Sequence, residues 1–246
     1  MIFQHQTIGY LATPFKEKFG VPRQSLMMTA AQGVLKLKPD PAFPLALKHL
    51  DQFSHIWLIF VFHKNGSKPW HPLIETPRIE AAQRMGVFAT RSPHRPNSIG
   101  MSAVKLERID LKAPGGIELH VSGVDILDGT PVLDIKPYLP FADRIDEANA
   151  GWAHTDIVRY PVRFSSESLR VIEKLSEGPY PQLKTLIEQM LELDPRPTSQ
   201  RRAAPLSAPA SESMKFAFRV LDFDVHWQVL EGSPYVLQIL PLTHPL

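Results

Sequence analysis

The sequence contains no cysteine, which excludes disulfide bonds, zinc–thiolate sites and a cysteine nucleophile. A secreted protein built on disulfides is thereby excluded, and a cytoplasmic protein is favoured. The longest apolar run, residues 56–62, is far too short to cross a bilayer, and the N-terminus shows no signal-peptide pattern. We therefore expect a cytoplasmic protein with no membrane association.

Several sequence signatures of common enzyme classes are also missing. The Gly-x-Gly-x-x-Gly turn of dinucleotide-binding folds, the phosphate-binding P-loop and the Gly-x-Ser-x-Gly nucleophile elbow do not occur. Strands do not alternate with regular amphipathic helices, which disfavours a doubly wound parallel sheet. His55, His71 and His94 have no metal-ligand spacing, so we expect no metal site.

The composition of the 246-residue chain is that of a globular protein with its own core, with 43% hydrophobic and 21% charged residues. A net charge of +2 does not by itself indicate a nucleic-acid binder. The arginines cluster locally, however, and each cluster is either ordinary solvated charge or an RNA contact. The first cluster is Arg84, Arg91 and Arg95, and the second is Arg196, Arg201 and Arg202.

The first part of the chain, residues 1–150, is predicted to be mainly β. Residues 56–62 are β-branched and aromatic, which is typical of a strand buried on both faces. Residues 117–122 alternate apolar and polar side chains, which predicts a half-buried strand. We also expect a strand at 87–89 and a short helix at 42–50. This pattern favours a β-barrel or sandwich over a Rossmann fold.

The second part, residues 155–246, is predicted to be a small α+β C-terminal domain. Ser165 is placed to cap a helix, and Leu183, Leu186, Ile187 and Met190 follow the spacing of a second helix. Residues 198–213 are rich in Ser, Ala and Pro and are expected to form a mobile loop. Alternating strands around the turn at 232–234 predict a β-hairpin.

The segment 91–100 holds two prolines, two arginines, a histidine and an asparagine directly after an apolar stretch. Proline restricts the backbone, so we expect a stiff loop. Such a loop can present guanidinium and amide groups to planar or anionic ligands. It can equally be a surface connection with ordinary salt bridges.

The segment 125–140 is the second candidate. Asp128-Gly129 is a tight-turn signal, and Asp134, Lys136 and Tyr138 share one parity. If the chain is extended there, the three side chains point to one side. They then form either a polar site or an exposed strand face with an ion pair.

Several long segments, in the right order, resemble the TrmO family (YaeB/VirR-like proteins), which are tRNA methyltransferases that use S-adenosylmethionine. The resemblance extends over nearly the whole chain. Its segments are 13–24, 53–63, 86–102, 123–143 and 194–197, followed by the final strands.

This resemblance implies a non-Rossmann β-barrel methyltransferase domain, a homodimer and S-adenosylmethionine as the methyl donor. It implies N6-methylation of threonylcarbamoyl-adenosine at position 37 of threonine tRNA. The sequence departs from the family pattern at two places. Ser98 stands where the family usually has proline, and residues 68–84 differ from the usual family sequence, which leaves tRNA contacts there open. The donor-binding residues that the resemblance implies are Pro22, Arg23, Gln24, His63, Lys64, Arg91, Met101, Leu127, Asp128, Gly129 and Thr130.

For the acceptor, we expect Asp134 and Tyr138 to orient the adenine amine and Lys136 to contact phosphate or the threonylcarbamoyl carboxylate. Arg95 and Asn97 are expected to shape their loop or to contact tRNA. In the C-terminal domain we expect Arg196, with Arg201 and Arg202, to hold tRNA, the alternative being a domain that only braces the barrel or dimer. The alternative function is a tRNA-binding module without catalysis.

Overall fold

The computed structural model describes residues 3–65, 69–75, 84–154, 157–212 and 214–242. Within these ranges, none of the helices has the length and apolar character needed to cross a bilayer. The chain forms two compact units, each assembled from more than one segment. Unit 1 comprises residues 1–12, 32–124 and 129–156, and unit 2 comprises residues 13–31, 125–128 and 157–246.

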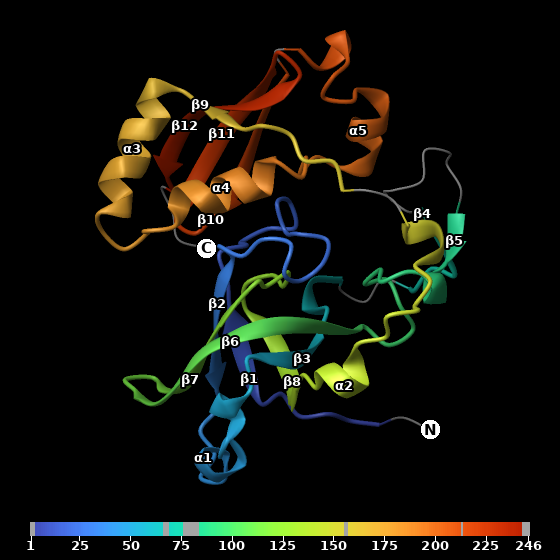
Figure 1. The fold of residues 1–246 in the computed structure, drawn as a ribbon, viewed down its shortest axis with the longest axis vertical. Coiled ribbons are helices and arrows are strands. Elements are labelled where there is room, and N and C mark those ends of the chain that lie inside the picture. Colours follow the sequence, from blue (N-terminus) through green and yellow to red (C-terminus); the bar gives the residue numbers. More distant parts are fainter. Residues whose placement is uncertain (1–2, 66–68, 76–83, 155–156, 213, 243–246) are drawn as a thin grey trace. The chain divides into compact units, whose positions relative to one another are not determined.

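Unit 1 is built around a closed β-barrel of six strands, as Figure 1 shows. The order around the barrel is β1-β2-β7-β6-β3-β8, and every pair of neighbours is antiparallel. The predicted β-barrel is thereby confirmed. Its strands are β1 (Gly9–Ala12), β2 (Gln32–Leu37), β3 (His55–Val61), β6 (Ile99–Ala113), β7 (Gly116–Ser122) and β8 (Thr130–Pro137).

The barrel interior is filled by alternate residues of each strand. On β3, the side chains of Ile56, Leu58 and Phe60 are buried, whereas Trp57 and Ile59 between them are only partly covered. A strand of a closed barrel has one face inside and one outside, so the two sets alternate. The predicted strand is confirmed, but the prediction that both its faces are buried is wrong.

Short elements connect the barrel strands. The predicted strand at 87–89 is wrong, because this segment forms a 3-10 turn. The Thr90 amide and hydroxyl both donate to the Val87 carbonyl, at 3.0 Å and 2.8 Å, and close the turn. The connecting elements are α1 (Phe43–Ala46), η1 (Leu50–Gln52), η2 (His63–Asn65), β4 (Leu73–Glu75), β5 (Arg84–Gly86), η3 (Val87–Ala89), α2 (Pro140–Asp143) and η4 (Gly151–Ala153).

Unit 2 contains a four-stranded sheet in the order β10-β11-β12-β9, with α3 and α4 lying against it (Figure 1). The predicted hairpin is confirmed as β11 and β12, which turn at Glu231 and Gly232, both with positive φ. The elements are β9 (Arg163–Phe164), α3 (Ser166–Ser176), α4 (Leu183–Leu191), α5 (Thr198–Ala203), η5 (Pro209–Ser211), β10 (Lys215–Val220), β11 (Phe223–Leu230) and β12 (Ser233–Pro241).

Both predicted helices of the C-terminal domain are confirmed. The Ser165 hydroxyl caps α3 by accepting from the Ser168 amide at 3.0 Å. The segment 198–213 is not the continuous loop that its composition suggests, because it contains α5 and η5. A helix of only six residues has no room for an apolar repeat, so its sequence carries no helical periodicity.

A substitution at Gly100 tests the packing beneath the end of the segment 91–100. A methyl group at this buried position would lie 2.5 Å from the Phe60 ring and 2.8 Å from the Phe62 ring. These two rings pack edge to face, with centroids 5.2 Å apart, and leave no space to yield. We expect Gly100→Ala to lower the free energy of unfolding by about 1–3 kcal/mol in chemical denaturation.

Gly115→Ala is the matched control, because nothing lies within 4 Å of a methyl group there. Equal stability of the two variants would contradict the packing argument.

Candidate functional site

Residues 87–100, here called the proline loop, are held in shape by hydrogen bonds within unit 1. The Arg95 guanidinium donates to the carbonyls of Thr90 and Val87, at 2.7 Å and 3.3 Å. The Asn65 amide donates to the Pro93 carbonyl at 2.6 Å, which ties the loop to η2. The loop is therefore stiff through its hydrogen bonds as well as its prolines, as expected from the sequence.

Arg95 shapes the loop, one of the two roles expected for it. Its guanidinium carbon lies 5.9 Å from the centre of the Phe88 ring, within the range of a cation–π contact. Phe88 itself is 76% exposed, and the Ala89 carbonyl beside it accepts from the Trp152 indole at 2.8 Å. A large aromatic ring is therefore displayed on a braced turn.

The departure at Ser98 leaves the loop's attachment to the barrel intact. The Phe62 amide donates to the Ser98 carbonyl at 2.9 Å, extending the β3–β6 pairing into the loop. A proline at this position would offer the same carbonyl, so the substitution costs no hydrogen bond here. Arg91 and Asn97 lie on the exposed side of the loop.

Three predicted site residues, Asp134, Met101 and Tyr138, lie on or beside the same outer face of the barrel. Asp134 of β8 and Met101 of β6 are both paired with Ile59 of β3, one from each side. Two strand spacings separate them, which is about 10 Å between backbones. Met101 is 59% exposed although it is apolar. Tyr138 follows β8, and its ring centroid lies 5.7 Å from that of Trp57 on the same strand as Ile59.

A β-bulge turns Asp134 toward solvent. The β3–β8 register pairs Phe60 with Val132 but Ile59 with Asp134, which leaves Leu133 as the extra residue. Without the bulge, the side chain of Asp134 would point into the barrel, as does that of the buried Val132. Lys136 lies on the same face as Asp134, and their side chains pair at 2.9 Å. The predicted common face of Asp134 and Lys136 is thereby observed.

Two further predicted residues approach each other where β3 ends and β8 begins. The Thr130 hydroxyl lies 3.3 Å from Nδ1 of His63. Thr130 is buried, and Gly129 before it has φ +70° and donates its amide to the Leu11 carbonyl at 2.9 Å. Only glycine adopts this conformation without strain, so Gly129 shapes the turn. Lys64 follows His63 in η2 and is exposed.

In unit 2, Asp128 joins the segments 125–128 and 13–31. Its carboxylate accepts from the Thr13 amide and from the Lys16 ammonium, both at 2.8 Å. The Thr13 hydroxyl in turn donates to the Ile126 carbonyl at 2.8 Å. Asp128 therefore has a structural task beside the donor contact that the resemblance implies. Leu127 is half-buried next to it.

The segment 13–31, which carries Pro22, Arg23 and Gln24, is anchored to the rest of unit 2 at both its ends. The Leu221 amide donates to the Pro14 carbonyl at 2.8 Å, and the Ala30 amide donates to the Gln189 side chain at 2.9 Å. Pro22 is buried and Arg23 is exposed. The predicted donor residues thus divide between the units. Pro22, Arg23, Gln24, Leu127 and Asp128 belong to unit 2, and the other six belong to unit 1.

Arg196 does not have the environment expected of a tRNA contact. Its side chain is only 1% exposed and forms two parallel hydrogen bonds with the Asp194 carboxylate, at 2.7 Å and 2.8 Å. Nη1 also donates to the Ala204 carbonyl at 2.9 Å. A guanidinium used in this way cannot reach a phosphate, so the expected tRNA contact of Arg196 needs correction. Asp194, two residues before Arg196, has a left-handed backbone conformation, with φ +47°.

Comparison with known proteins extends this picture to a family. The model of the tRNA-methyltransferase O N-terminal domain matches residues 10–144, and the TrmO C-terminal domain matches residues 158–242. The chain belongs to the tRNA-methyltransferase O family. Together the two matches include every predicted site residue of this chain.

Relatives of the TrmO family resemble this chain along nearly its whole length. It is 39% identical over 241 residues to the tRNA (adenine(37)-N6)-methyltransferase of Escherichia coli, covering 97% of this chain and 98% of that protein. It is 40% identical over 220 residues to a Pseudomonas aeruginosa protein named as a putative S-adenosylmethionine-dependent methyltransferase, covering 89% and 90%. A crystal structure of the Pseudomonas aeruginosa TrmO matches with TM-score 0.74 and 37% identity, over 98% of both chains.

Sequence reasoning did not single out Phe88, Ile59 or Trp57. Phe88 and Trp57 belong to apolar runs that look like core, and only the turn η3 and the closed barrel show which faces are outside. Exposure of a large aromatic side chain has no signal in a single sequence.

Replacement of Arg95 separates its two expected roles. If the guanidinium braces the proline loop, Arg95→Ala should increase amide hydrogen exchange in residues 87–95 and weaken donor binding. The slope of log affinity for tRNA against log salt should stay unchanged, because no phosphate contact is lost.

Arg108→Ala is the control, since Arg108 is an exposed arginine of β6 that pairs with Asp110 at 3.3 Å. A salt slope reduced by about 1 in Arg95→Ala would show a phosphate contact instead.

Proposed function

We propose that this protein transfers a methyl group from S-adenosylmethionine to N6 of adenine 37 in tRNA. The observation that carries the proposal is the similarity to the Escherichia coli tRNA (adenine(37)-N6)-methyltransferase, which extends over 97% of this chain. The closed barrel supports this proposal. A barrel methyltransferase does not need the glycine-rich turn of a Rossmann fold, and the sequence has no such turn.

The residues of unit 1 suit the chemistry of the donor. Arg91 offers an exposed guanidinium that can bind the carboxylate of the methionine part. Met101 offers an exposed apolar side chain for the flat adenosine part. His63 and Thr130 offer polar groups where β3 ends and β8 begins. When bound, S-adenosylmethionine supplies an electrophilic methyl group. The donor contacts of the five residues in unit 2 stay a prediction from the family resemblance.

The acceptor needs help because the lone pair of an adenine amine is delocalised into the ring. We assign its orientation to Asp134 and Tyr138, which lie on the outer face of the barrel, across β3 from Met101. A carboxylate beside the amine can accept its proton, and a fixed orientation lowers the entropic part of the barrier. Lys136 holds the Asp134 carboxylate at 2.9 Å and offers a positive charge to the substrate.

The finer parts of the proposal concern substrate, assembly and location. The adenosine carries a threonylcarbamoyl group in threonine tRNA, Asn97 contacts the RNA, and the protein acts as a homodimer in the cytoplasm. Exposed apolar side chains support the dimer, because association with a second chain would cover them. In unit 1 they include Phe88, Ile99, Met101, Phe141 and Ile145.

Methyl transfer to tRNA tests the function directly. Purified protein should incorporate methyl groups into tRNA from cells that lack the activity, and mass analysis should place the product on the modified adenosine. Titration calorimetry with S-adenosylmethionine should give heat of binding, and light scattering should give the mass of two chains. The alternative, a tRNA-binding module without catalysis, predicts tRNA binding with no heat from the donor and no product.

Substitution of Asp134 and Tyr138 tests their proposed roles. We expect Asp134→Ala to lower kcat about 10²-fold or more, as for loss of a general base, and Tyr138→Phe to lower it less. Donor affinity in calorimetry should change little. Wild-type turnover in both variants would exclude these residues from catalysis.

The controls are Asp110→Ala and Tyr10→Phe, an aspartate and an exposed tyrosine of other barrel strands. Both should keep wild-type kcat.

A further inference from the structure

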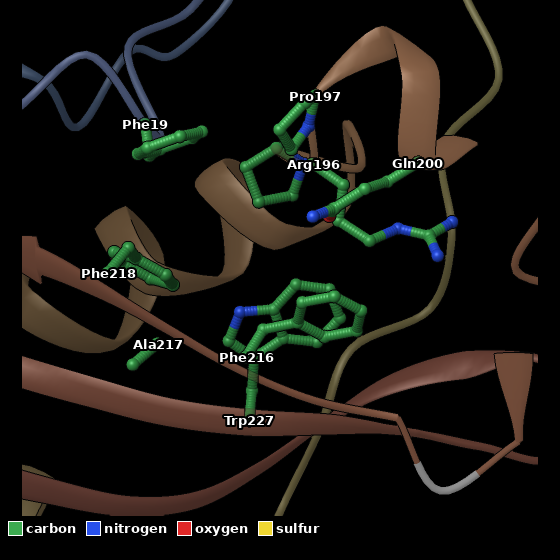
Figure 2. Close-up of a pocket in the computed structure, with 9 residues that line it drawn as sticks. Phe19, Arg196, Pro197, Gln200, Phe216, Ala217, Phe218 and Trp227 are labelled. Carbon is green, nitrogen blue, oxygen red and sulfur yellow. The ribbon is translucent and has the colours of Figure 1, made fainter. Parts of the chain in front are cut away.

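Unit 2 contains a pocket whose lining includes a single predicted site residue, Arg196. Its volume is about 150 Å³, and mainly apolar and aromatic side chains surround it (Figure 2). The residues that line it are Phe19, Pro195, Arg196, Pro197, Gln200, Phe216, Ala217, Phe218 and Trp227.

One wall of this pocket is an aromatic stack. The rings of Phe216 and Trp227 lie 4.7 Å apart at an angle of 29°, on paired positions of β10 and β11. The guanidinium carbon of Arg196 lies 5.6 Å from the centre of the Phe216 ring. Because Asp194 fixes that guanidinium through two hydrogen bonds, the stack is held at its place by the buried ion pair.

The remaining walls are stiff on one side and open on the other. Pro195 and Pro197 flank Arg196, and both line the pocket. Proline has little conformational freedom to lose when a ligand binds. Phe19, from the segment 13–31, borders the pocket and is 50% exposed. A ligand there would cover it and recover the apolar contact that it lacks.

The polar and charged groups lie at the rim. Gln200 is exposed on α5, and Figure 2 shows its side chain extending over the aromatic stack. Its amide offers both a donor and an acceptor. Lys18 precedes Phe19, whereas Lys215 and Arg219 lie on the opposite face of β10 from Phe216 and Phe218. Asp224 lies opposite Arg219 but also pairs with His226 at 3.4 Å.

We propose that this aromatic pocket takes one unpaired base of the tRNA substrate. The proposal rests on the proposed function. A base is flat and neutral, so it suits apolar walls with one amide at the edge. An anion alone does not suit the interior, because the guanidinium there is already neutralised by Asp194.

Two exposed residues allow a test without disturbing the core. Phe19→Ala should raise the Kd for unmodified tRNA about tenfold, the range of a lost base stack. Gln200→Ala should raise it about fivefold, the range of one hydrogen bond. The slope of log Kd against log salt should stay that of the wild type, because a neutral base releases no counterions. Donor affinity in calorimetry should not change.

The base itself can be located with 2-aminopurine placed singly at unpaired positions of the tRNA. One position should lose fluorescence on binding the wild-type protein and recover it with Phe19→Ala. The controls are Leu169→Ala and Gln182→Ala, exposed side chains of the same unit outside the pocket. Thermal unfolding of all four variants checks that they fold.

Three results separate the possible failures. If the wild type methylates tRNA but the pocket variants bind it like the controls, the pocket proposal is wrong and the proposed function stands. If the wild type transfers no methyl group, the proposed function is wrong whatever the variants do. If the pocket variants change the mass in light scattering and not the RNA affinity, the occupant is a second copy of the chain, which also overturns the proposal.

Discussion

Closure of the barrel through β8 is the constraint on which the rest of unit 1 depends. β8 pairs with β1 on one side and with β3 on the other, so all six strands have two neighbours. Closure leaves no unpaired strand edge and gives each strand one inner and one outer face. The outer face can then carry chemistry without cost to the core.

The bulge in β8 shows how closely that chemistry depends on pairing. One extra residue, Leu133, moves Asp134 from the buried parity of Val132 to the outside, beside Ile59 and opposite Met101. The proline loop leads into β6 and is held by the guanidinium of Arg95 and by a hydrogen bond from Phe62, just after β3. The positions of the residues of unit 1 predicted to bind donor and acceptor thus follow from strand register and a few loop hydrogen bonds.

In unit 2, a buried ion pair holds neighbouring side chains in fixed positions. The Asp194–Arg196 pair lies in the interior, where two charges are stable only if their hydrogen bonds are satisfied. It fixes the prolines on either side and the aromatic stack beneath. The cluster of Arg196, Arg201 and Arg202 therefore does not act as one basic surface, since its first member belongs to the interior.

The sequence by itself determined the β class of the first domain, the two long helices and hairpin of the second, and the family. Each depends on local periodicity or on long matching segments. The sequence also placed Asp134 and Lys136 on one face, although it could not reveal the bulge that turns this face outward.

Only the tertiary structure decided which apolar residues are exposed, that 87–89 is a turn, that residues 198–203 form a helix and that Arg196 is buried. It also showed that the segment 13–31 packs within unit 2. The reason is physical: exposure depends on segments far apart in the chain packing together, as Thr13 and Lys16 do with Asp128, and a local pattern carries no record of this. Even Asp194 and Arg196, only two residues apart, show their buried pairing only in the folded chain.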